Sequence, residues 1–251
     1  MSLEAIWGRR TIHEALRAGR RRIHEIYVAE GVKDREISEI LELCASSGVS
    51  AQYIRRSIMD ERAPDSVHQG VVGMFDPYPY ASIPEMLSLA SARGEDPLLI
   101  LAAHIEDPHN LGSILRTAEC AGAHGIILPK RRSASVTPAV VRVSAGASEH
   151  LRVARVTNLV RTVEELKEER LWVFGAEVGG VSLYDANLAG GLVLCVGAEG
   201  VGLPRLLRET CDELIEIPLR GRVESLNVGV AAGVVVYEAI RRRMSEPGTH
   251  G

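Results

Sequence analysis

The amino-acid sequence predicts an α/β fold, with a mostly parallel sheet in its larger part and a smaller α/β domain before it. Five short apolar runs lie between positions 98 and 217, and helix-length segments separate them. The runs are continuously apolar rather than alternating, as strands are when helices cover both faces of their sheet. The predicted strands are Leu98–Ala103, Gly125–Leu128, Leu171–Gly175, Leu192–Val196 and Leu214–Ile217.

The first 75 residues carry their own alternation of helix and strand signals. These signals are a helix near Gly8–Arg17, a β-rich run at Ile23–Ala29, an amphipathic stretch at Asp34–Ser46 and a strand near Gly70–Phe75. We therefore expect a compact domain over residues 1–75.

Proline marks the boundary between the two parts. The sequence reads Asp76-Pro-Tyr-Pro-Tyr and continues to Pro84 and a turn at Gly94–Pro97. Because proline favours extended chain, we predict a linker at residues 76–95 and a second domain over residues 96–251. The last segment, Asn227–Arg243, is predicted to be a long helix, and its three final arginines suit a helix C-terminus.

Composition narrows the class of protein. The 251 residues are 46% hydrophobic and 25% charged, as in ordinary globular proteins. The longest apolar stretch is far shorter than the roughly 20 residues that cross a bilayer, and the N-terminus lacks a signal pattern, so we expect a soluble, cytoplasmic protein. Four cysteines without a CxxC pair indicate neither a metal site nor a disulfide framework.

Arginines gather near the N-terminus, although the net charge of the chain is −4. The first 22 residues hold six arginines against two glutamates. This cluster is a candidate contact surface for nucleic-acid phosphates, and a solvated helix face is the alternative. The candidate nucleic-acid-binding residues are Arg9, Arg10, Arg20, Arg21 and Arg22.

Ligands of open parallel sheets bind beyond the carboxyl ends of the strands, so the loops after the apolar runs are informative. The first loop, His104–Ala118, leads into a helix with Asn110 as a plausible cap and Arg116 inside the second turn. An arginine there suits a phosphate or carboxylate ligand. The alternative is a surface arginine paired with Glu119 or Asp107.

The second loop, Val196–Pro204, holds glycines at 197, 200 and 202 that would let backbone approach a ligand closely. Their spacing differs from the dinucleotide fingerprint, and Glu199 would repel a pyrophosphate. Glu216 lies roughly where a ribose-binding acid is expected, so an NAD-dependent enzyme remains an alternative.

The third loop, Ile217–Asn227, leads into the terminal helix and carries Arg220 and Arg222. Ser225 or Asn227 could cap that helix. A cap does not explain a ten-residue loop with so many polar groups before an apolar helix.

Together the three loops resemble the motifs of the SpoU/TrmH-type RNA ribose 2′-O-methyltransferases, in the SPOUT superfamily of S-adenosylmethionine enzymes. The motifs are Asp107–Ala118, Gly197–Leu203, and Ile217–Leu219 with Ser225–Val228, in the family's order. The resemblance covers about residues 97–243 and implies a knotted α/β domain.

The N-terminal part is similar to the family's small RNA-binding domain of the L30e type. The similarity lies in Gly8-Arg9-Arg10, in the segment 13–16 and in His68-Gln-Gly-Val71. It points within the family to the bacterial large-subunit (23S) rRNA guanosine 2′-O-methyltransferases.

The resemblance implies roles for individual residues. The cofactor S-adenosylmethionine would be held by backbone groups of Gly197, Gly200, Ile217, Leu219 and Leu226. The transferring methyl group and the ribose would be surrounded by Asn110, Arg116, Glu199, Ser225 and Asn227. Since arginine is a poor proton acceptor, we assign Arg116 to clamping the adjacent phosphate and stabilising alkoxide charge, with Glu199 or a water taking the proton.

The same resemblance implies partners. These are RNA, with ribosomal RNA favoured over tRNA, and a second copy of the chain that forms a homodimer through the catalytic domain. Gly229 stands where family members often carry serine, and we expect it to weaken the terminal helix by roughly 1 kcal/mol. A non-enzymatic RNA-binding module is the third alternative, and the intact motif residues argue against it.

Overall fold

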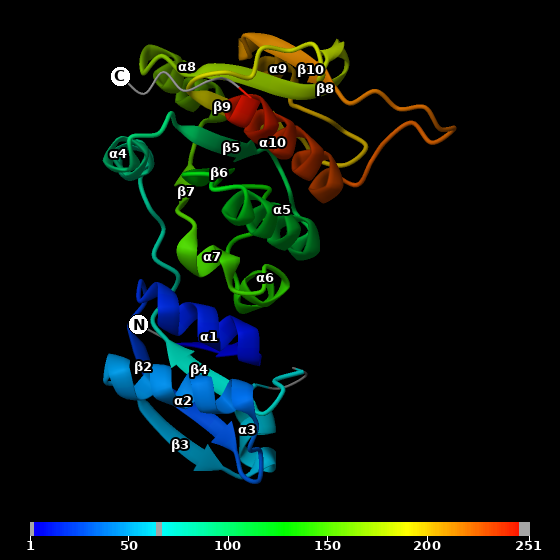
Figure 1. Cartoon of the computed structure of the whole chain (residues 1–251). Coiled ribbons are helices and arrows are strands. Elements are labelled where there is room, and N and C mark those ends of the chain that lie inside the picture. Colours follow the sequence, from blue (N-terminus) through cyan, green and yellow to red (C-terminus); the bar gives the residue numbers. More distant parts are fainter. Residues whose placement is uncertain (1–2, 64–66, 246–251) are drawn as a thin grey trace. The chain divides into compact units, whose positions relative to one another are not determined.

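The computed structural model describes residues 3–63 and 67–245. Contacts divide the chain into two compact units, which are drawn in Figure 1. The first unit takes residues up to 79 together with residues 135–150, and the second takes residues 80–134 and those from 151 onward.

The first unit is a four-stranded mixed sheet with helices. Its elements are β1 (Glu4–Trp7), α1 (Arg9–Ala18), β2 (Ile23–Ala29), α2 (Arg35–Ser47), β3 (Ser50–Ile54), α3 (Arg56–Arg62), β4 (Val71–Phe75), α6 (Pro138–Val143) and α7 (Ala147–His150). The strand order is β1-β4-β2-β3, with β2 parallel to β3 and antiparallel to β4. The predictions at α1, β2, α2 and β4 are confirmed, whereas the short elements β1, β3 and α3 were not predicted.

A buried arginine holds the two stretches of the first unit together. The side chain of Arg21 is 1% exposed and donates to both carboxylate oxygens of Glu149, at 2.9 and 3.1 Å. It also pairs with Glu4 at 2.9 Å and lies over the rings of Phe75 and Tyr78. Arg21 was expected to contact RNA phosphates, and that expectation is wrong because its guanidinium is enclosed by the protein.

The second unit is built on a six-stranded sheet in which every pair of neighbouring strands is parallel. The strand order is β10-β8-β9-β5-β6-β7. Its elements are α4 (Ile83–Arg93), β5 (Leu98–Ala102), α5 (Pro108–Cys120), β6 (Gly125–Pro129), β7 (Val153–Val156), α8 (Leu159–Glu168), β8 (Trp172–Ser182), β9 (Leu192–Val196), α9 (Arg205–Thr210), β10 (Glu213–Glu216) and α10 (Val228–Ser245). The predicted parallel sheet and its five strands are confirmed, and β7 is an addition.

Helices cover the central strands, which explains why their sequences are continuously apolar. Every residue of β5, β6 and β9 is buried. A hydrophobic cluster joins α4, α8 and α9 to the sheet, and its members include Met86, Leu99, Val163, Cys195 and Leu207. Helix α10 contacts both α5 and β9, and Figure 1 shows it lying along α5. Among the described helices, none is long and apolar enough to cross a membrane.

Helix α4 lies inside the segment that was expected to be an extended linker. The Ser82 hydroxyl accepts a hydrogen bond from the backbone of Glu85, and the Glu85 carboxylate accepts one from the backbone of Ser82 at 2.7 Å. Pro84 falls in the first turn, where a missing N–H costs no helical hydrogen bond. The expectation of extended chain is therefore wrong for residues 83–93. The domain boundaries at residues 75 and 96 stay a prediction.

We predict that Arg21→Met destabilises the first unit by about 3–5 kcal/mol, because it leaves the buried Glu149 carboxylate without its partner. The free energy of unfolding is measured in urea from Trp7 fluorescence, in a Trp172→Phe background that removes the signal of the second unit.

Arg9→Met is the matched control, since the ion pairs of Arg9 are partly exposed and each should contribute no more than about 1 kcal/mol. Adding Glu149→Leu to Arg21→Met should recover most of the loss. Equal effects of the Arg9 and Arg21 substitutions would contradict a structural role for Arg21.

Candidate active site at the carboxyl edge of the parallel sheet

In the second sheet, the order in which the chain connects the strands reverses between β5 and β9. From β5 the chain proceeds to β6 and β7 on one side, while β9, β8 and β10 lie on the other. Connections that leave neighbouring strands in opposite directions open a crevice beyond their carboxyl ends, which is where ligands of open α/β sheets bind. The loops after β5, β9 and β10 all begin at this edge because the strands are parallel.

Asn227 connects these three loops. Its Oδ1 accepts hydrogen bonds from the backbone of Gly229 at 3.0 Å and Val230 at 3.4 Å, so Asn227 caps α10. Its Nδ2 donates to Asn110 Oδ1 at 2.8 Å and to Glu199 Oε2 at 3.3 Å. Three of the five predicted catalytic residues therefore form one hydrogen-bonded group, which we call the Asn227 cluster.

The cluster leaves two polar groups for a ligand. Within the part of the chain that the structure describes, the amide nitrogen of Asn110 and the second carboxylate oxygen of Glu199 have no hydrogen-bond partner. One is a donor and the other an acceptor. A hydroxyl both donates and accepts, so this pair matches the needs of an alcohol.

Asn110 reaches the cluster because another residue caps its helix. The Asp107 side chain accepts a hydrogen bond from the backbone of His109 at 3.0 Å, and Pro108 is the first helical residue, where proline is favoured. The expectation that Asn110 caps α5 is therefore wrong. Its side chain, placed in the first turn, is directed to Asn227 instead.

Arg116 and Ser225 lie outside the cluster. Arg116 is exposed in the third turn of α5 rather than the second, and it pairs with none of the described residues. The alternative pairing with Glu119 or Asp107 is thus not formed. Ser225 is exposed in the loop before α10. Both side chains are accessible to a substrate, and their catalytic roles stay predictions.

The loop after β9 closes so tightly that two of its positions require glycine. The backbone of Gly202 donates to the carbonyl of Ala198 at 2.9 Å. A Cβ on Gly197 would lie 2.1 Å from the carbonyl carbon of Gly202. Gly202 itself has a φ of 72°, and a Cβ there would lie 2.7 Å from the Glu177 carboxylate. Gly200, by contrast, lies in open space.

Two carboxylates of the neighbouring strands brace this edge. Glu177 of β8 accepts a hydrogen bond from the backbone of Leu203 at 2.9 Å, and Glu216 of β10 accepts one from Gly179 at 2.7 Å. Glu216 was the ribose-binding acid of the NAD alternative, and its carboxylate is engaged by the protein. Glu177 was not predicted. Its one sequence signal is its place just after the apolar run Leu171–Gly175.

The loop before α10 offers free backbone groups. Residues 217–226 make no hydrogen bond to any other residue in the described ranges. Ile217, Leu219 and Leu226 lie in this loop, which meets the glycine turn where Asn227 donates to Glu199. Main-chain groups without a protein partner are suited to a ligand that is held by backbone hydrogen bonds.

A cysteine beneath the site is chemically inert. Cys195 is fully buried in β9, directly before the glycine turn. Its hydrogen bond with Cys211, together with burial, raises the pKa of the Cys195 thiol well above the ordinary value. The thiol stays protonated at neutral pH and is a poor nucleophile, so the site's chemistry does not run through it.

In the first unit, the predicted RNA-binding arginines differ in accessibility. Arg9 pairs with Asp34 and Glu36 at 2.8 and 2.9 Å. Arg20 donates to the backbone carbonyls of Glu149 and Pro79, and Arg21 is buried. Arg10 and Arg22 are exposed and pair with no described residue. These last two offer the charge that a phosphate could reach.

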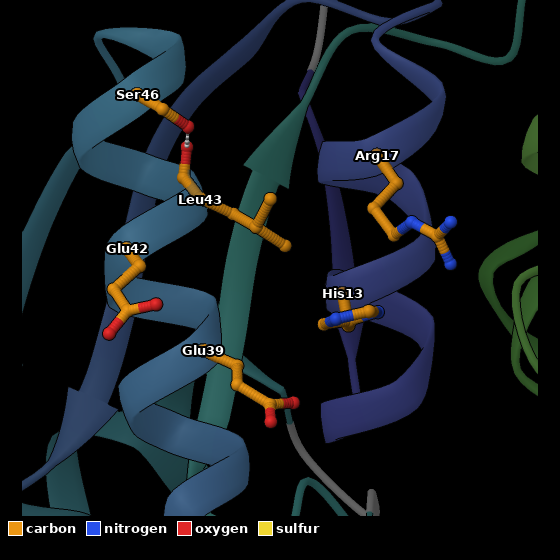
Figure 2. Close-up of a pocket in the computed structure, with 6 residues that line it drawn as sticks. All are labelled: His13, Arg17, Glu39, Glu42, Leu43 and Ser46. Atoms are coloured by element: carbon orange, nitrogen blue, oxygen red, sulfur yellow. Dashed lines mark hydrogen bonds between the residues drawn. The ribbon is translucent and has the colours of Figure 1, made fainter.

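The first unit also has a hollow between α1 and α2, shown in Figure 2, and none of the predicted site residues line it. His13 and Arg17 come from α1, and Glu39, Glu42, Leu43 and Ser46 come from α2. Arg17 on one helix faces Glu39 and Glu42 on the other, so with His13 neutral the lining carries a formal charge of −1 and does not suit an anionic RNA. The carboxyl edge of the second unit is the better candidate site.

Comparison with known families matches both parts of the chain. Residues 97–237 match the model of the SpoU rRNA Methylase family. Residues 5–81 match the model described as RNA 2′-O ribose methyltransferase substrate binding.

Relatives match the chain over almost its whole length. The chain is 38% identical over 244 residues to the 23S rRNA (guanosine-2′-O-)-methyltransferase RlmB of Escherichia coli, covering 96% of this chain and 99% of that protein. It is 41% identical over 239 residues to YacO of Bacillus subtilis, which bears a TrmH family tRNA/rRNA methyltransferase name, covering 94% of each. In fold, it resembles the SpoU methyltransferase AviRb of Streptomyces viridochromogenes in complex with AdoMet, with a TM-score of 0.81, 24% identity and coverage of 97% of this chain and 91% of that one.

We predict that Asn227→Ala destabilises the second unit by about 2–4 kcal/mol. About 1 kcal/mol comes from the lost cap, and about 0.5–1.5 kcal/mol from each lost side-chain hydrogen bond. Unfolding in urea is followed by Trp172 fluorescence in a Trp7→Phe background.

Asn158→Ala is the matched control, because Asn158 caps α8 in the same unit and, among the residues that the structure describes, its side chain accepts only from Arg161. It should cost about 1 kcal/mol. In a double-mutant cycle, Asn110→Ala should couple to Asn227→Ala and add independently to Asn158→Ala. Additive behaviour of both pairs would mean that the cluster does not hold in solution.

Proposed function

Because the chain belongs to the SpoU rRNA methylase family, we propose that it transfers a methyl group from S-adenosylmethionine to a ribose 2′-hydroxyl of RNA. The observation that carries this proposal is the Asn227 cluster, which presents a donor and an acceptor at the crevice of the sheet. A hydroxyl of a substrate can accept from the donor and donate to the acceptor of this cluster, so both of its hydrogen bonds are satisfied there.

A guanosine of 23S ribosomal RNA is the substrate that the relatives favour. The E. coli relative bears that activity in its name, and the shared identity spans both parts of the chain. The match of residues 5–81 to a substrate-binding model supports a role of the first unit in RNA recognition, and Arg10 and Arg22 are exposed there. Transfer RNA is the second candidate, since the name of the B. subtilis relative includes it.

The loops around the glycine turn fit the cofactor. We assign the cofactor to main-chain groups of Gly197, Gly200, Ile217, Leu219 and Leu226, and this is supported by residues 217–226 making no hydrogen bond to another of the described residues. The Glu199 carboxylate beside this turn would repel the pyrophosphate of NAD, whereas S-adenosylmethionine carries no phosphate.

The cluster explains how the ribose hydroxyl could be activated. Bound S-adenosylmethionine supplies a methyl group whose bond to a positive sulfur breaks as the bond to the ribose oxygen forms. The free oxygen of Glu199 takes the hydroxyl proton directly or through a water. The Asn110 amide donates to the same ribose oxygen and holds it in place. Asn227 orients both side chains, and Ser225 is exposed two residues before it.

In this proposal Arg116 acts as a positive charge near the RNA and not as the base that takes the hydroxyl proton. Its exposed guanidinium has no acidic partner among the described residues, so it is available to clamp the phosphate next to the target ribose and to stabilise developing alkoxide charge. A guanidinium group stays protonated in proteins, so an arginine is a poor proton acceptor.

A homodimer through the catalytic domain completes the proposal. Helix α10 leaves Val230 and Tyr237 about half exposed, at 53% and 49%. These two residues are seven apart and share one face of the helix. A second copy of the chain would cover this apolar face. Light scattering at micromolar concentrations should give twice the monomer mass, and a monomer mass would contradict the dimer.

The proposed cofactor is tested by thermal stability and by transfer. S-adenosylmethionine should raise the melting temperature of the protein, and NAD should leave it unchanged, because only a ligand of the folded state stabilises by mass action. Tritium from labelled S-adenosylmethionine should enter large-subunit ribosomal RNA and not tRNA. A shift with NAD alone, or transfer to no RNA, would overturn the proposed function.

We predict that Arg116→Lys retains methyl transfer at a reduced rate, because the charge remains and the planar fork is lost. Arg116→Ala should lose about 100-fold or more. Both variants should keep the thermal shift with S-adenosylmethionine. If Arg116 were the base, the lysine variant would instead gain activity as pH rises towards its reference pKa of about 10.4. Near-normal turnover of Arg116→Ala would make Arg116 an ordinary surface residue.

A further inference from the structure

We infer that the second unit binds the RNA backbone on both sides of the target nucleotide, through two basic loops that follow β6 and β10 at the carboxyl edge of the sheet. The first loop holds Lys130, Arg131 and Arg132 after β6, and the second holds Arg220 and Arg222 after β10. We call these the β6 loop and the β10 loop. This inference rests on RNA being the substrate, as proposed above.

All five cations are available to a ligand. Each side chain is exposed, and none forms an ion pair with a residue in the described part of the chain. Elsewhere in the second unit, exposed arginines such as Arg161 and Arg205 pair with glutamates one helical turn away. Uncompensated cations on a chain whose net charge is −4 are typical of phosphate contacts.

The β6 loop is held firmly against the loop that carries Asn110. The backbone of Lys130 donates to Val156 at 2.8 Å, and the carbonyl of Lys130 accepts from the Arg155 side chain at 2.8 Å. His104 donates from its ring to the carbonyl of Arg132 at 3.2 Å. The chain just after the β6 loop is held in the same way, because the backbone N–H of Ala134 donates to the carbonyl of Ile105 at 2.8 Å. The cations are thus fixed beside the first site loop.

Strand order sets the separation of the points from which the two loops start. Between β6 and β10 lie β5, β9 and β8, so the Asn227 cluster, built after β5 and β9, stands between the ends of these two strands. With strands about 4.8 Å apart, the four steps from the end of β6 to the end of β10 span about 19 Å. An RNA strand crossing this edge would place its phosphates at the ends and one ribose at the centre.

The charges at the centre agree with this placement. Glu106, Asp107 and Glu199 are exposed there and would repel phosphates. A neutral ribose hydroxyl meets no such repulsion. The alternation of positive, negative and positive charge along the edge therefore favours one register, in which backbone phosphates lie on the flanks.

The test neutralises each end in the full-length protein. Lys130→Gln with Arg131→Gln removes two charges from the β6 loop, and Arg220→Gln with Arg222→Gln removes two from the β10 loop. Arg132 is left unchanged because its φ of 53° is unusual for a non-glycine residue. The matched control is Arg93→Gln with Arg152→Gln, which removes two charges next to the starts of β5 and β7, at the opposite edge of the sheet.

Binding to a large-subunit rRNA transcript is measured as a function of NaCl concentration. Each double variant should flatten the slope of log K against log [salt] by about 1.4 to 1.8, since each phosphate contact contributes about 0.7 to 0.9. The β6-loop variant should raise KM for RNA, with kcat at saturating RNA and the thermal shift with S-adenosylmethionine unchanged. The control should keep the wild-type slope.

Several outcomes would overturn the inference. These are an unchanged slope in both loop variants, a change at one end only, or an equal change in the control. Failure of the proposed function looks different: the wild-type protein would bind the transcript with a salt slope that depends on both loops, yet transfer no methyl group to it.

Discussion

Every hydrogen-bonding group of the Asn227 side chain is engaged within the protein, and the geometry of the site depends on these bonds. Its side-chain oxygen caps α10, and its amide nitrogen donates to Asn110 and Glu199. One amide thus fixes the beginning of the terminal helix, the first turn of α5 and the tip of the glycine turn relative to one another. Removing one of these bonds would loosen the orientation of the two groups that remain free for the ribose.

The same junction requires two helices to approach closely. A Cβ on Gly229 would lie 2.9 Å from the Ser113 hydroxyl and 3.2 Å from Asn227 Oδ1. Gly229 was expected mainly to weaken the terminal helix. In the structure, the absence of a side chain at Gly229 lets α10 pack closely against α5. The residue therefore permits close packing next to the site, in addition to lowering the helix propensity of α10.

Charge is arranged differently in the two units. In the first, Arg9, Arg20 and Arg21 satisfy carboxylates and carbonyls of their own unit, and Arg10 and Arg22 remain exposed. In the second, the cations at the carboxyl edge have no acidic partner among the described residues. Counting arginines along the chain therefore points to the N-terminus, whereas counting exposed and unpaired ones points also to the edge of the parallel sheet.

The sequence by itself determined the parallel α/β sheet, five of its six strands and the loops that carry the site, because burial on both faces and glycine-rich turns leave local patterns. Asn110, Glu199 and Asn227 lie in those loops, and the resemblance to a methyltransferase family assigned them to the site. The tertiary structure alone decided that Asp107 rather than Asn110 caps α5, that Glu177 braces the glycine turn, and that Arg21 is buried against Glu149. Glu149 is 128 residues away from Arg21, and a pairing at that separation follows from how the chain folds back, not from any pattern in neighbouring residues.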